Sequence, residues 1–308
     1  MRLTLRQVEV FSAVARHQSV SRAAEELAMS QSATSTALGE LERAYDHALF
    51  DRVGKSLRLN EIGAMLLPAA VELLDQAAQI ENLLEGRAGF GLLRIGATLT
   101  IGNYLATLIV GQHLQRHPES RVELQVHNSA RIIQQIANFE LDLGLVEGDC
   151  SHRDLVVTPW INDELAVFCA PGHRLAGHGP VPLAELARES WIMREQGSGT
   201  RQALEYALAP HQFRPDVRLE LEHTEAIKRA VESGLGIGCI SRLALREASR
   251  RGSLVLLEVP ELNLRRRFNF VWHARKYQTP GLRAFLDECH AFTAGARRSD
   301  EIELPYIP

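Results

Sequence analysis

The chain has 308 residues, which is long enough for two or three domains. Hydrophobic residues make up 45% of it, yet no apolar run approaches the roughly 20 residues of a membrane span. The net charge of −4 excludes a protein that is basic throughout, so any surface that binds nucleic acid must be local. Because the N-terminus also lacks the apolar region of a secretion signal, we expect a cytoplasmic protein.

The first sixty residues predict a helix followed by a helix-turn-helix. Residues 19–28 form a short helix pattern that Ser19 would cap, and residues 31–42 form a second one that Ser30 would cap. Leu38 and Leu41 are spaced to pack on an earlier helix that contains Phe11. In a helix-turn-helix the second helix enters the major groove of DNA.

The face of this second helix favours DNA contact. Its first turns carry short hydroxyl or amide side chains, which can hydrogen-bond base edges or phosphates without crowding the groove. The residues that we predict to contact DNA here are Gln31, Ser32, Thr34, Ser35 and Thr36. The alternative is an ordinary cluster of three helices with a polar surface.

Residues 49–60 predict a small β-hairpin, or wing, directly after the helices. Apolar residues alternate around the turn at Gly54, and Arg52, Lys55 and Arg58 would project towards phosphates or a minor groove. Residues 1–60 contain eight Lys and Arg against seven Asp and Glu, so their net charge is only +1. The wing therefore concentrates the positive charge that a DNA-binding domain needs.

In this order the motifs resemble the LysR-type transcriptional regulators. The matching segments are residues 5–11, 21–27, 30–35, 38–42, 48–52 and 59–63, and the resemblance extends to about Phe292. It implies a sequence-specific DNA-binding regulator that forms a homodimer or homotetramer, responds to a small-molecule effector and can contact RNA polymerase. It also adds Ser21 and Arg22 to the predicted DNA contacts.

Three positions depart from the family pattern. The family usually has Pro where Ser32 stands, and often a basic or amide residue at Thr36 and Gly39. These departures leave the operator sequence open, and they do not affect the predicted role in DNA binding.

A long helix is predicted after the wing. Asn60 would cap a helix that runs to Leu84, and its apolar stripe is too wide for a solitary surface helix. We interpret it as a dimerisation helix, with a core helix of one globular domain as the alternative. Three glycines in residues 86–91 predict a hinge. The predicted domains are residues 1–60 (DNA-binding), 61–91 (linker helix and hinge), 92–293 (effector-binding) and 294–308 (tail).

The remaining chain predicts an α/β fold with two lobes. Strands at 92–97, 122–127 and 141–146 alternate with helices at 102–116 and 130–139, which is the βαβαβ order of a parallel sheet. A second unit follows, and the last helix covers 280–292. The strands of the second unit are expected at 164–170, 191–193, 217–221 and 238–241, and its helices at 200–208 and 224–233. Two further strands, at 254–259 and 268–273, are expected where the chain returns towards the first unit. Two such lobes resemble a periplasmic-binding-protein-like sensor. The tail, residues 294–308, has no predicted function.

Small polar residues occupy four of the predicted strand-to-helix junctions. Ligands of open α/β sheets bind at the carboxyl ends of strands, and helix N-termini favour anions. The family resemblance places the effector contacts at Thr98, Thr100, Ser129, Thr200 and Thr224. We therefore expect an anionic effector. The negative charge of Glu147 near the cleft could restrict which anions fit. For each junction taken alone, a simple helix cap is the alternative.

Other motifs point away from an enzyme. We identify no catalytic signature and no pair of histidines as metal ligands, so we expect no enzymatic activity, no metal and no cofactor. Residues 234–238 (GLGIG) follow a predicted helix, which is the wrong order for a dinucleotide-binding loop. We interpret the four cysteines as buried thiols, with a redox pair left open; they are Cys150, Cys169, Cys239 and Cys289.

Two functions remain in competition at this stage. The first is a transcriptional regulator of the LysR type. The second is a small-molecule-binding or transport-related protein whose N-terminal helices only mediate protein contacts. The basic wing favours the first, because the second has no need of Arg52, Lys55 and Arg58 beside a polar-faced helix.

Overall fold

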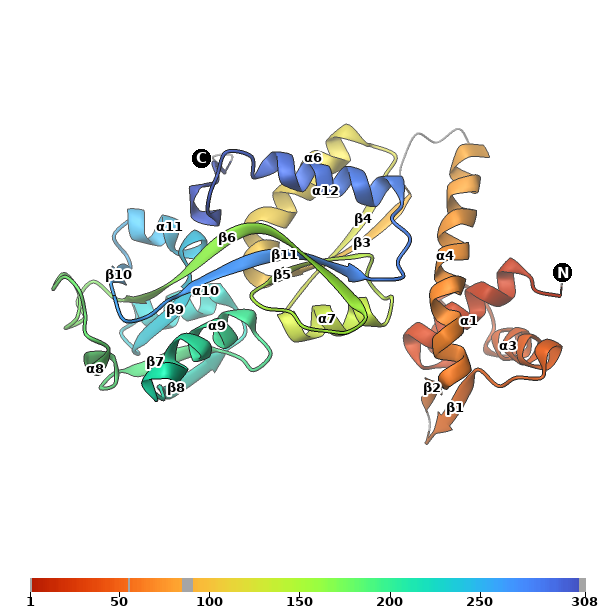
Figure 1. Cartoon of the computed structure of the whole chain (residues 1–308), viewed down its shortest axis with the longest axis horizontal. Coiled ribbons are helices and arrows are strands. Elements are labelled where there is room, and N and C mark those ends of the chain that lie inside the picture. The colour runs from red at the N-terminus through yellow and green to blue at the C-terminus, as the bar shows by residue number, and fades with distance from the viewer. Residues whose placement is uncertain (1, 55, 85–90, 305–308) are drawn as a thin grey trace.

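The computed structural model describes residues 2–54, 56–84 and 91–304. A helical N-terminal part stands at one end of the molecule beside a larger α/β part (Figure 1). Among the described residues no helix has the length and apolar character needed to cross a membrane.

The N-terminal part is a winged helix-turn-helix. It contains α1 (Leu5–His17), α2 (Val20–Glu26), α3 (Gln31–Tyr45), β1 (Phe50–Val53) and β2 (Ser56–Leu59). The predicted caps are confirmed, since Ser19 accepts a hydrogen bond from the Arg22 amide and Ser30 accepts one from the Ala33 amide. The rings of Phe11 and Phe50 lie 5.6 Å apart in the core, which joins the helices to the antiparallel hairpin.

Helix α4 (Glu61–Leu84) leaves the hairpin as a continuous helix of 24 residues. The side chain of Asn60 accepts a hydrogen bond from the Gly63 amide at 2.9 Å and so caps the helix, as the sequence predicts. A Cβ at Gly63 would lie 2.2 Å from the carbonyl oxygen of Leu49, so this close approach of helix and strand requires glycine. The predicted hinge at 86–91 falls almost entirely outside the described residues.

The first lobe of the α/β part is built on three parallel strands. Strand β3 (Leu92–Thr98) pairs with β4 (Arg121–His127) on one side and with β5 (Leu143–Glu147) on the other. The helices of this lobe are α5 (Leu99–Ile101), the π-helical turn η1 (Gly102–Ala106), α6 (Thr107–Arg116) and α7 (Ser129–Ala137). The first helix begins at Leu99, three residues earlier than predicted, directly at the end of β3.

The second lobe repeats this arrangement. Strand β7 (Ser190–Arg194) pairs in parallel with β8 (Asp216–Leu221) and β9 (Ile237–Ser241). The other elements of this lobe are α8 (Leu183–Leu186), α9 (Gly199–Leu208), η2 (Ala209–His211), α10 (Thr224–Glu232), α11 (Arg242–Arg250) and β10 (Val255–Leu257). Residues 234–236 form the turn between α10 and β9, which agrees with the rejection of a dinucleotide-binding loop.

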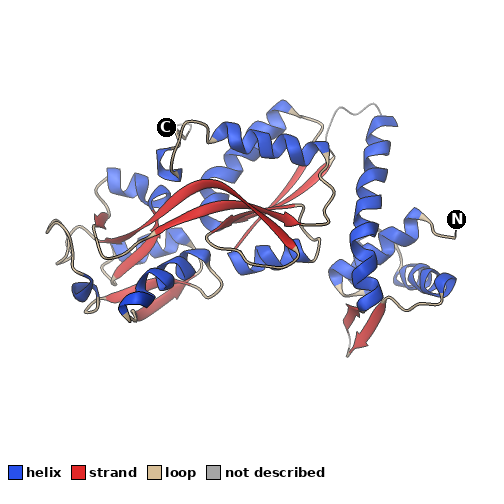
Figure 2. Ribbon diagram, viewed as in Figure 1, coloured by secondary structure: helices blue, strands red, loops and turns tan. Residues whose placement is uncertain are grey.

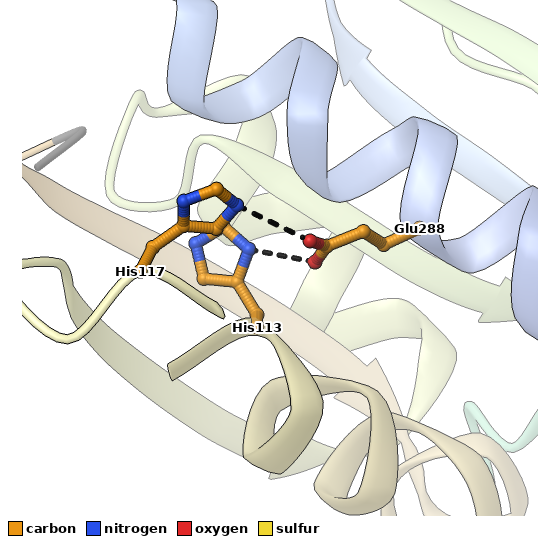
Figure 3. A group of neighbouring side chains, drawn as sticks. All are labelled: His113, His117 and Glu288. Carbon is orange, nitrogen blue, oxygen red and sulfur yellow. Dashed lines mark hydrogen bonds and ion pairs between the residues drawn. The ribbon is translucent and has the colours of Figure 1, made fainter. Parts of the chain in front are cut away.

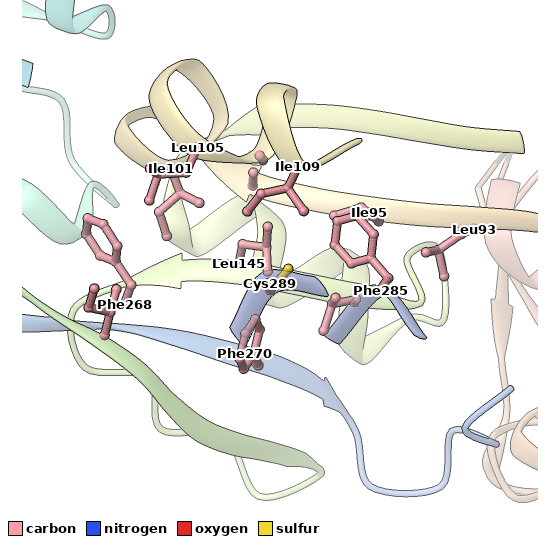
Figure 4. Packing of buried hydrophobic residues seen from close by; sticks show 14 of the residues in the cluster. Leu93, Ile95, Ile101, Leu105, Ile109, Leu145, Phe268, Phe270, Phe285 and Cys289 are labelled. Carbon is pink, nitrogen blue, oxygen red and sulfur yellow. The ribbon is translucent and has the colours of Figure 1, made fainter. Parts of the chain in front are cut away.

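Two long antiparallel strands, β6 (Leu155–Cys169) and β11 (Arg265–His273), connect the lobes. Figure 2 shows them crossing the whole α/β part, and they complete a nine-stranded sheet of order β4-β3-β5-β11-β6-β9-β7-β8, with β10 beside β6. Helix α12 (Pro280–Phe292) returns to the first lobe, where Phe285 and Cys289 pack against Ile95 and Ile109 (Figure 4).

The C-terminal tail is part of the fold up to Leu304, the last residue that the structure describes. A short 3-10 helix, η3 (Ser299–Glu301), contacts β6 and α11, and Ser299 and Ile302 are buried. The guanidinium of Arg246 on α11 donates to the carbonyl oxygens of Asp300 and Ile302.

Candidate functional site

Helix α3 presents most of its predicted DNA contacts to solvent. Gln31, Ser32, Ser35 and Thr36 are exposed along its first two turns. Ser21 and Arg22 at the start of α2 are exposed as well. These side chains are therefore accessible to the edges of bases or to phosphates.

Thr34 is an exception and corrects the sequence prediction. Its side chain is fully buried, and its hydroxyl donates to the carbonyl oxygen of Ser30 at 3.0 Å. Thr34, Leu38 and Leu41 follow the i, i+4, i+7 spacing of one helix face, which packs on the core of the domain. Thr34 therefore cannot reach a base in this conformation.

The predicted hairpin is present, and its register pairs Asp51 with Arg58 and Val53 with Ser56. The side chains of Arg52 and Arg58 are exposed. Lys55 lies outside the described residues. The two arginines give the wing exposed positive charge.

Helix α4 carries an apolar face that nothing in the described chain covers. The exposed fractions are 41% for Ile62, 70% for Met65, 39% for Leu73, 58% for Ile80 and 82% for Leu84. Their spacing places them along one side of the helix. We call this set the α4 stripe.

A buried carboxylate lies at the junction of the two lobes. Glu147, the last residue of β5, is 2% exposed. Its carboxylate accepts hydrogen bonds from the Thr100 amide at 2.7 Å, the Thr200 hydroxyl at 3.1 Å and the Arg266 guanidinium at 2.8 Å. Glu147 therefore already accepts hydrogen bonds from Thr100 and Thr200, two residues that we predicted to bind an external anion.

The charge of Glu147 is well compensated. Burial alone would raise the pKa of its carboxyl, but the charges of Arg266 and Arg194 and the hydrogen bonds from Thr100 lower it to about 2. Glu147 is therefore ionised at neutral pH.

Arg266 extends this network to the tail. Its Nε donates to Asp163 at 2.6 Å, and Asp163 also accepts from the hydroxyls of Ser241 and Ser299. Sequence reasoning missed Arg266, Asp163 and Ser299. Arg266 could have been recognised within the run 265–267, because β-strand alternation turns the middle arginine of three towards one face.

The other predicted effector residues are also buried. The Thr98 hydroxyl donates to the carbonyl oxygen of Leu145, and Ser129 links the lobes, since its hydroxyl donates to the Glu147 carbonyl oxygen and accepts from the Gly199 amide. Thr224 is 1% exposed at the start of α10. Thr100, Ser129 and Thr200 thus meet at the lobe junction, and Thr98 and Thr224 are buried at the starts of α5 and α10. All five residues are covered by protein.

A cavity of about 470 Å³ opens beside this junction. The first lobe contributes His127, Asn128 and Arg131 to its wall, and the second contributes Glu195, Glu222 and His223. Burial and the nearby charge of Arg131 lower the pKa of His127. Leu99, Asn128 and His223 line this space and are chain neighbours of Thr98, Thr100, Ser129 and Thr224.

The cysteines are free thiols, and Cys169, Cys239 and Cys289 are buried. Burial raises the pKa of Cys169 to about 11 and that of Cys239 to about 12. These thiols are protonated at neutral pH, which disfavours reaction as thiolates.

One group of possible metal ligands lies away from the lobe junction. His113, His117 and Glu288 place three ligand atoms within 4.8 Å of one another (Figure 3). The sequence prediction overlooked this pair of histidines, although their i, i+4 spacing puts them on one side of a helix.

Comparison with known proteins agrees with both parts of the fold. Residues 5–64 match the family described as "Bacterial regulatory helix-turn-helix protein, lysR family", and residues 87–294 match the family described as "LysR substrate binding domain". An uncharacterized HTH-type transcriptional regulator of Escherichia coli K12, YeiE, is 43% identical over 94% of this chain and 98% of its own length.

Solved structures extend this similarity. The Synechocystis CcmR regulatory domain, solved in complex with 2-PG, is 33% identical over 67% of this chain and 99% of that chain, with a TM-score of 0.63. A full-length OxyR variant from Pseudomonas aeruginosa shares the fold at 21% identity, with a TM-score of 0.71 over 94% of this chain and 95% of that one.

Proposed function

The chain belongs to the LysR-type transcriptional regulators, which bind DNA and carry a small-molecule-binding domain, and we propose that its effector is a small anion bound between the two lobes. In this proposal the anion binds in the cavity of about 470 Å³, next to the buried residues Thr98, Thr100, Ser129 and Thr224, whose chain neighbours line it. Thr200 would act from the second lobe through its contact with Glu147. The protein would work in the cytoplasm, where its DNA target lies, as a regulator rather than an enzyme.

The observation that carries this proposal is the position of the cavity. It lies between the lobes and is lined by Arg131, a cation that can pair with an anion. Of the two carboxylates in the same lining, Glu195 and Glu222, the first is already paired with Arg194. The N-cap residue of α10, His223, makes no side-chain capping hydrogen bond, and backbone N–H groups at a helix N-terminus favour anions. The 2-PG complex of the related CcmR regulatory domain supports a small molecule in this domain.

Titration calorimetry of the full-length protein with small carboxylates and with 2-PG tests the proposal. Arg131→Gln should weaken the binding of a hit by roughly tenfold or more, because it removes a charge-assisted contact. Arg153→Gln is the control, since the Arg153 side chain is 91% exposed and lies outside the cavity lining. Equal affinities of the two variants would place the ligand elsewhere.

We also propose that the α4 stripe holds a homodimer together, with a second contact between α/β parts forming a homotetramer. Apolar side chains as exposed as Met65 and Leu84 favour a covering partner, and a second copy of α4 offers a matching surface. A dimer presents two α3 helices to half-sites about one helical turn apart, so the operator should be a rough palindrome. Bound at a promoter, this assembly would act on RNA polymerase.

Leu73→Glu tests the dimer. A charge inside a helix pair costs about 3 kcal/mol, so this variant should lose both its dimer mass and its operator affinity. Ala78→Glu is the matched control, because it adds the same charge at an exposed position on another side of α4. Light scattering and gel shifts with DNA upstream of the gene measure both properties. Wild-type mass and affinity in Leu73→Glu would exclude dimerisation through the stripe.

A further inference from the structure

We propose that His113, His117 and Glu288 form a binding site for a divalent transition-metal ion, with Zn²⁺ as the first candidate. The site lies on the first lobe, where α6 and α12 pack together, and is separate from the lobe junction. Neither DNA recognition nor the proposed effector cavity makes use of these three residues.

The geometry brings three ligand atoms to one point. His113 lies in the last turn of α6, and His117 follows as its C-cap residue, so both imidazoles lie on the same side of the helix end. The carboxylate of Glu288 on α12 faces both imidazoles (Figure 3). Its Oε2 lies 2.8 Å from His113 Nδ1 and its Oε1 lies 3.3 Å from His117 Nε2.

These distances suit an ion in the centre. Zn–N and Zn–O bonds of about 2.0–2.2 Å place the ligand atoms of a tetrahedral site roughly 3.3–3.5 Å apart. The ligand atoms here already lie within 4.8 Å of one another, so adjustments of about 1 Å in side-chain position would complete the site. Three protein ligands leave a fourth position, which a water molecule would take.

The ligand types select the class of metal. Two imidazole nitrogens with one carboxylate oxygen suit Zn²⁺, Co²⁺, Ni²⁺ or Cu²⁺, whereas Mg²⁺ and Ca²⁺ require oxygen ligands. The burial also suits a specific site, because the His113 side chain is 1% exposed and that of Glu288 is 11% exposed. His117 is 28% exposed and leaves a path for the ion from solvent.

One positive charge lies nearby. Arg116 Nη1 is 3.5 Å from Glu288 Oε1, and an incoming cation would repel it. The Arg116 side chain is 57% exposed, so it can turn into water at little cost. The alternative is that no ion binds here and that the Glu288 carboxylate serves only as a hydrogen-bond partner of the two imidazoles.

A bound ion would stabilise the closure of the first lobe. His113 and Glu288 are 175 residues apart in the sequence, and the ion would join the end of α6 to the last long helix of the chain. Because the folded chain assembles the ligands and the unfolded chain does not, metal binding should raise the unfolding temperature.

The test uses the full-length, tag-free protein after removal of metals by a chelator. Calorimetry should show one Zn²⁺ per chain with a Kd of about 1 µM or below, and Co²⁺ should give the absorption of a nitrogen- and oxygen-ligated ion without a thiolate band. His117→Gln and Glu288→Gln should each weaken binding by roughly 100-fold or more, because loss of an outer-shell partner alone costs 10–100-fold. Mg²⁺ should give neither heat nor a thermal shift.

His173→Gln provides the matched control. His173 and Glu189 form an imidazole–carboxylate pair at 3.1 Å in the second lobe, and within the described chain they belong to no group of three metal ligands. This variant should bind Zn²⁺ as the wild type does. Absence of binding in the wild type, a thiolate band with Co²⁺, or undiminished affinity in both His117→Gln and Glu288→Gln would overturn the proposal. Both substitutions keep a polar side chain at a partly exposed position, so the test does not depend on the buried His113.

Discussion

Gln31, Ser35 and Thr36 on α3, the second helix of the helix-turn-helix, are exposed, whereas Glu147 and Arg266 between the two lobes are almost completely buried. Exposed hydroxyl and amide groups keep their hydrogen-bonding capacity for a partner outside the protein. Buried charges must be satisfied within it, because an unpaired charge in a protein interior is costly. Polar groups are therefore left available for an outside partner on α3, whereas at the lobe junction they are used within the protein.

The two regions also differ in how far apart in the sequence their interacting residues lie. On α3 the polar groups are contiguous in sequence and need only a helix to share one side. At the lobe junction Glu147 and Arg266 are 119 residues apart, and Asp163 and Arg266 are 103 apart. This network of hydrogen bonds forms only when the whole sheet is assembled. It therefore depends on how the two lobes are positioned relative to each other.

The largest effect is expected for Arg266→Met. This change would leave Glu147 and Asp163 buried without their cation, at a cost of about 3–5 kcal/mol in the free energy of unfolding. Arg265→Met is the matched control, because Arg265 is exposed on the same strand. Urea unfolding followed by tryptophan fluorescence suits this test, since Trp160, Trp191 and Trp272 all lie in the α/β part. Similar unfolding free energies for the two variants would show that the network contributes little.

Glu147 predicts a specific pH dependence of stability. Its pKa falls from 4.5 to about 2 on folding, so its stabilising contribution is present above pH 4.5 and is lost as the pH falls towards 2. The unfolding free energy of the wild type should therefore decrease more steeply over this interval than that of Glu147→Gln. Parallel curves for the two proteins would contradict the lowered pKa.

The sequence predicted those elements whose signals are local. Helix α12 was predicted at its observed bounds, because Thr279 caps it and Pro280 occupies its first position. The first half of β6 was missed, since Pro159 lies within it and proline disfavours a central strand. Helix α11 was missed as well; its many charged residues hide the buried face formed by Leu243, Leu245 and Ala248.

The candidate site residues also divide into those that local sequence predicts and those that depend on tertiary contacts. The polar character of α3 could be predicted from residue types, but the exclusion of Thr34 required attention to the face it shares with Leu38. Glu147 was expected near the cleft because it ends a strand, whereas its pairing with Arg266 depends on a contact between distant strands. The local sequence pattern therefore identified candidate residues. The tertiary structure determined which of their polar groups remain available to bind a partner.

Gln31 and Thr34 separate an exposed group from a buried one on the same helix. Gln31→Ala should change the preference between operator variants by about 1–3 kcal/mol, because it removes a group that can contact a base. Thr34→Val removes the hydroxyl bound to Ser30 and should cost about 1 kcal/mol of stability while the relative preferences persist. Competition gel shifts with single-base operator variants measure this. A changed preference in Thr34→Val would indicate that α3 rearranges on DNA.

The smallest expected effect concerns the wing. Arg58→Ala removes about one phosphate contact from each protomer, so binding should weaken similarly for all sequences. For the proposed dimer, the slope of log K against log salt should become shallower by about 1.8. Arg58 is exposed on β2, so its removal should leave folding stability unchanged. Arg188→Ala in the second lobe provides a charge-matched control, because the Arg188 side chain is 73% exposed. Binding measured by fluorescence anisotropy over a range of salt concentrations gives both slopes. If Arg58→Ala and Arg188→Ala both have the same slope as the wild type, the wing does not contact the DNA backbone through Arg58.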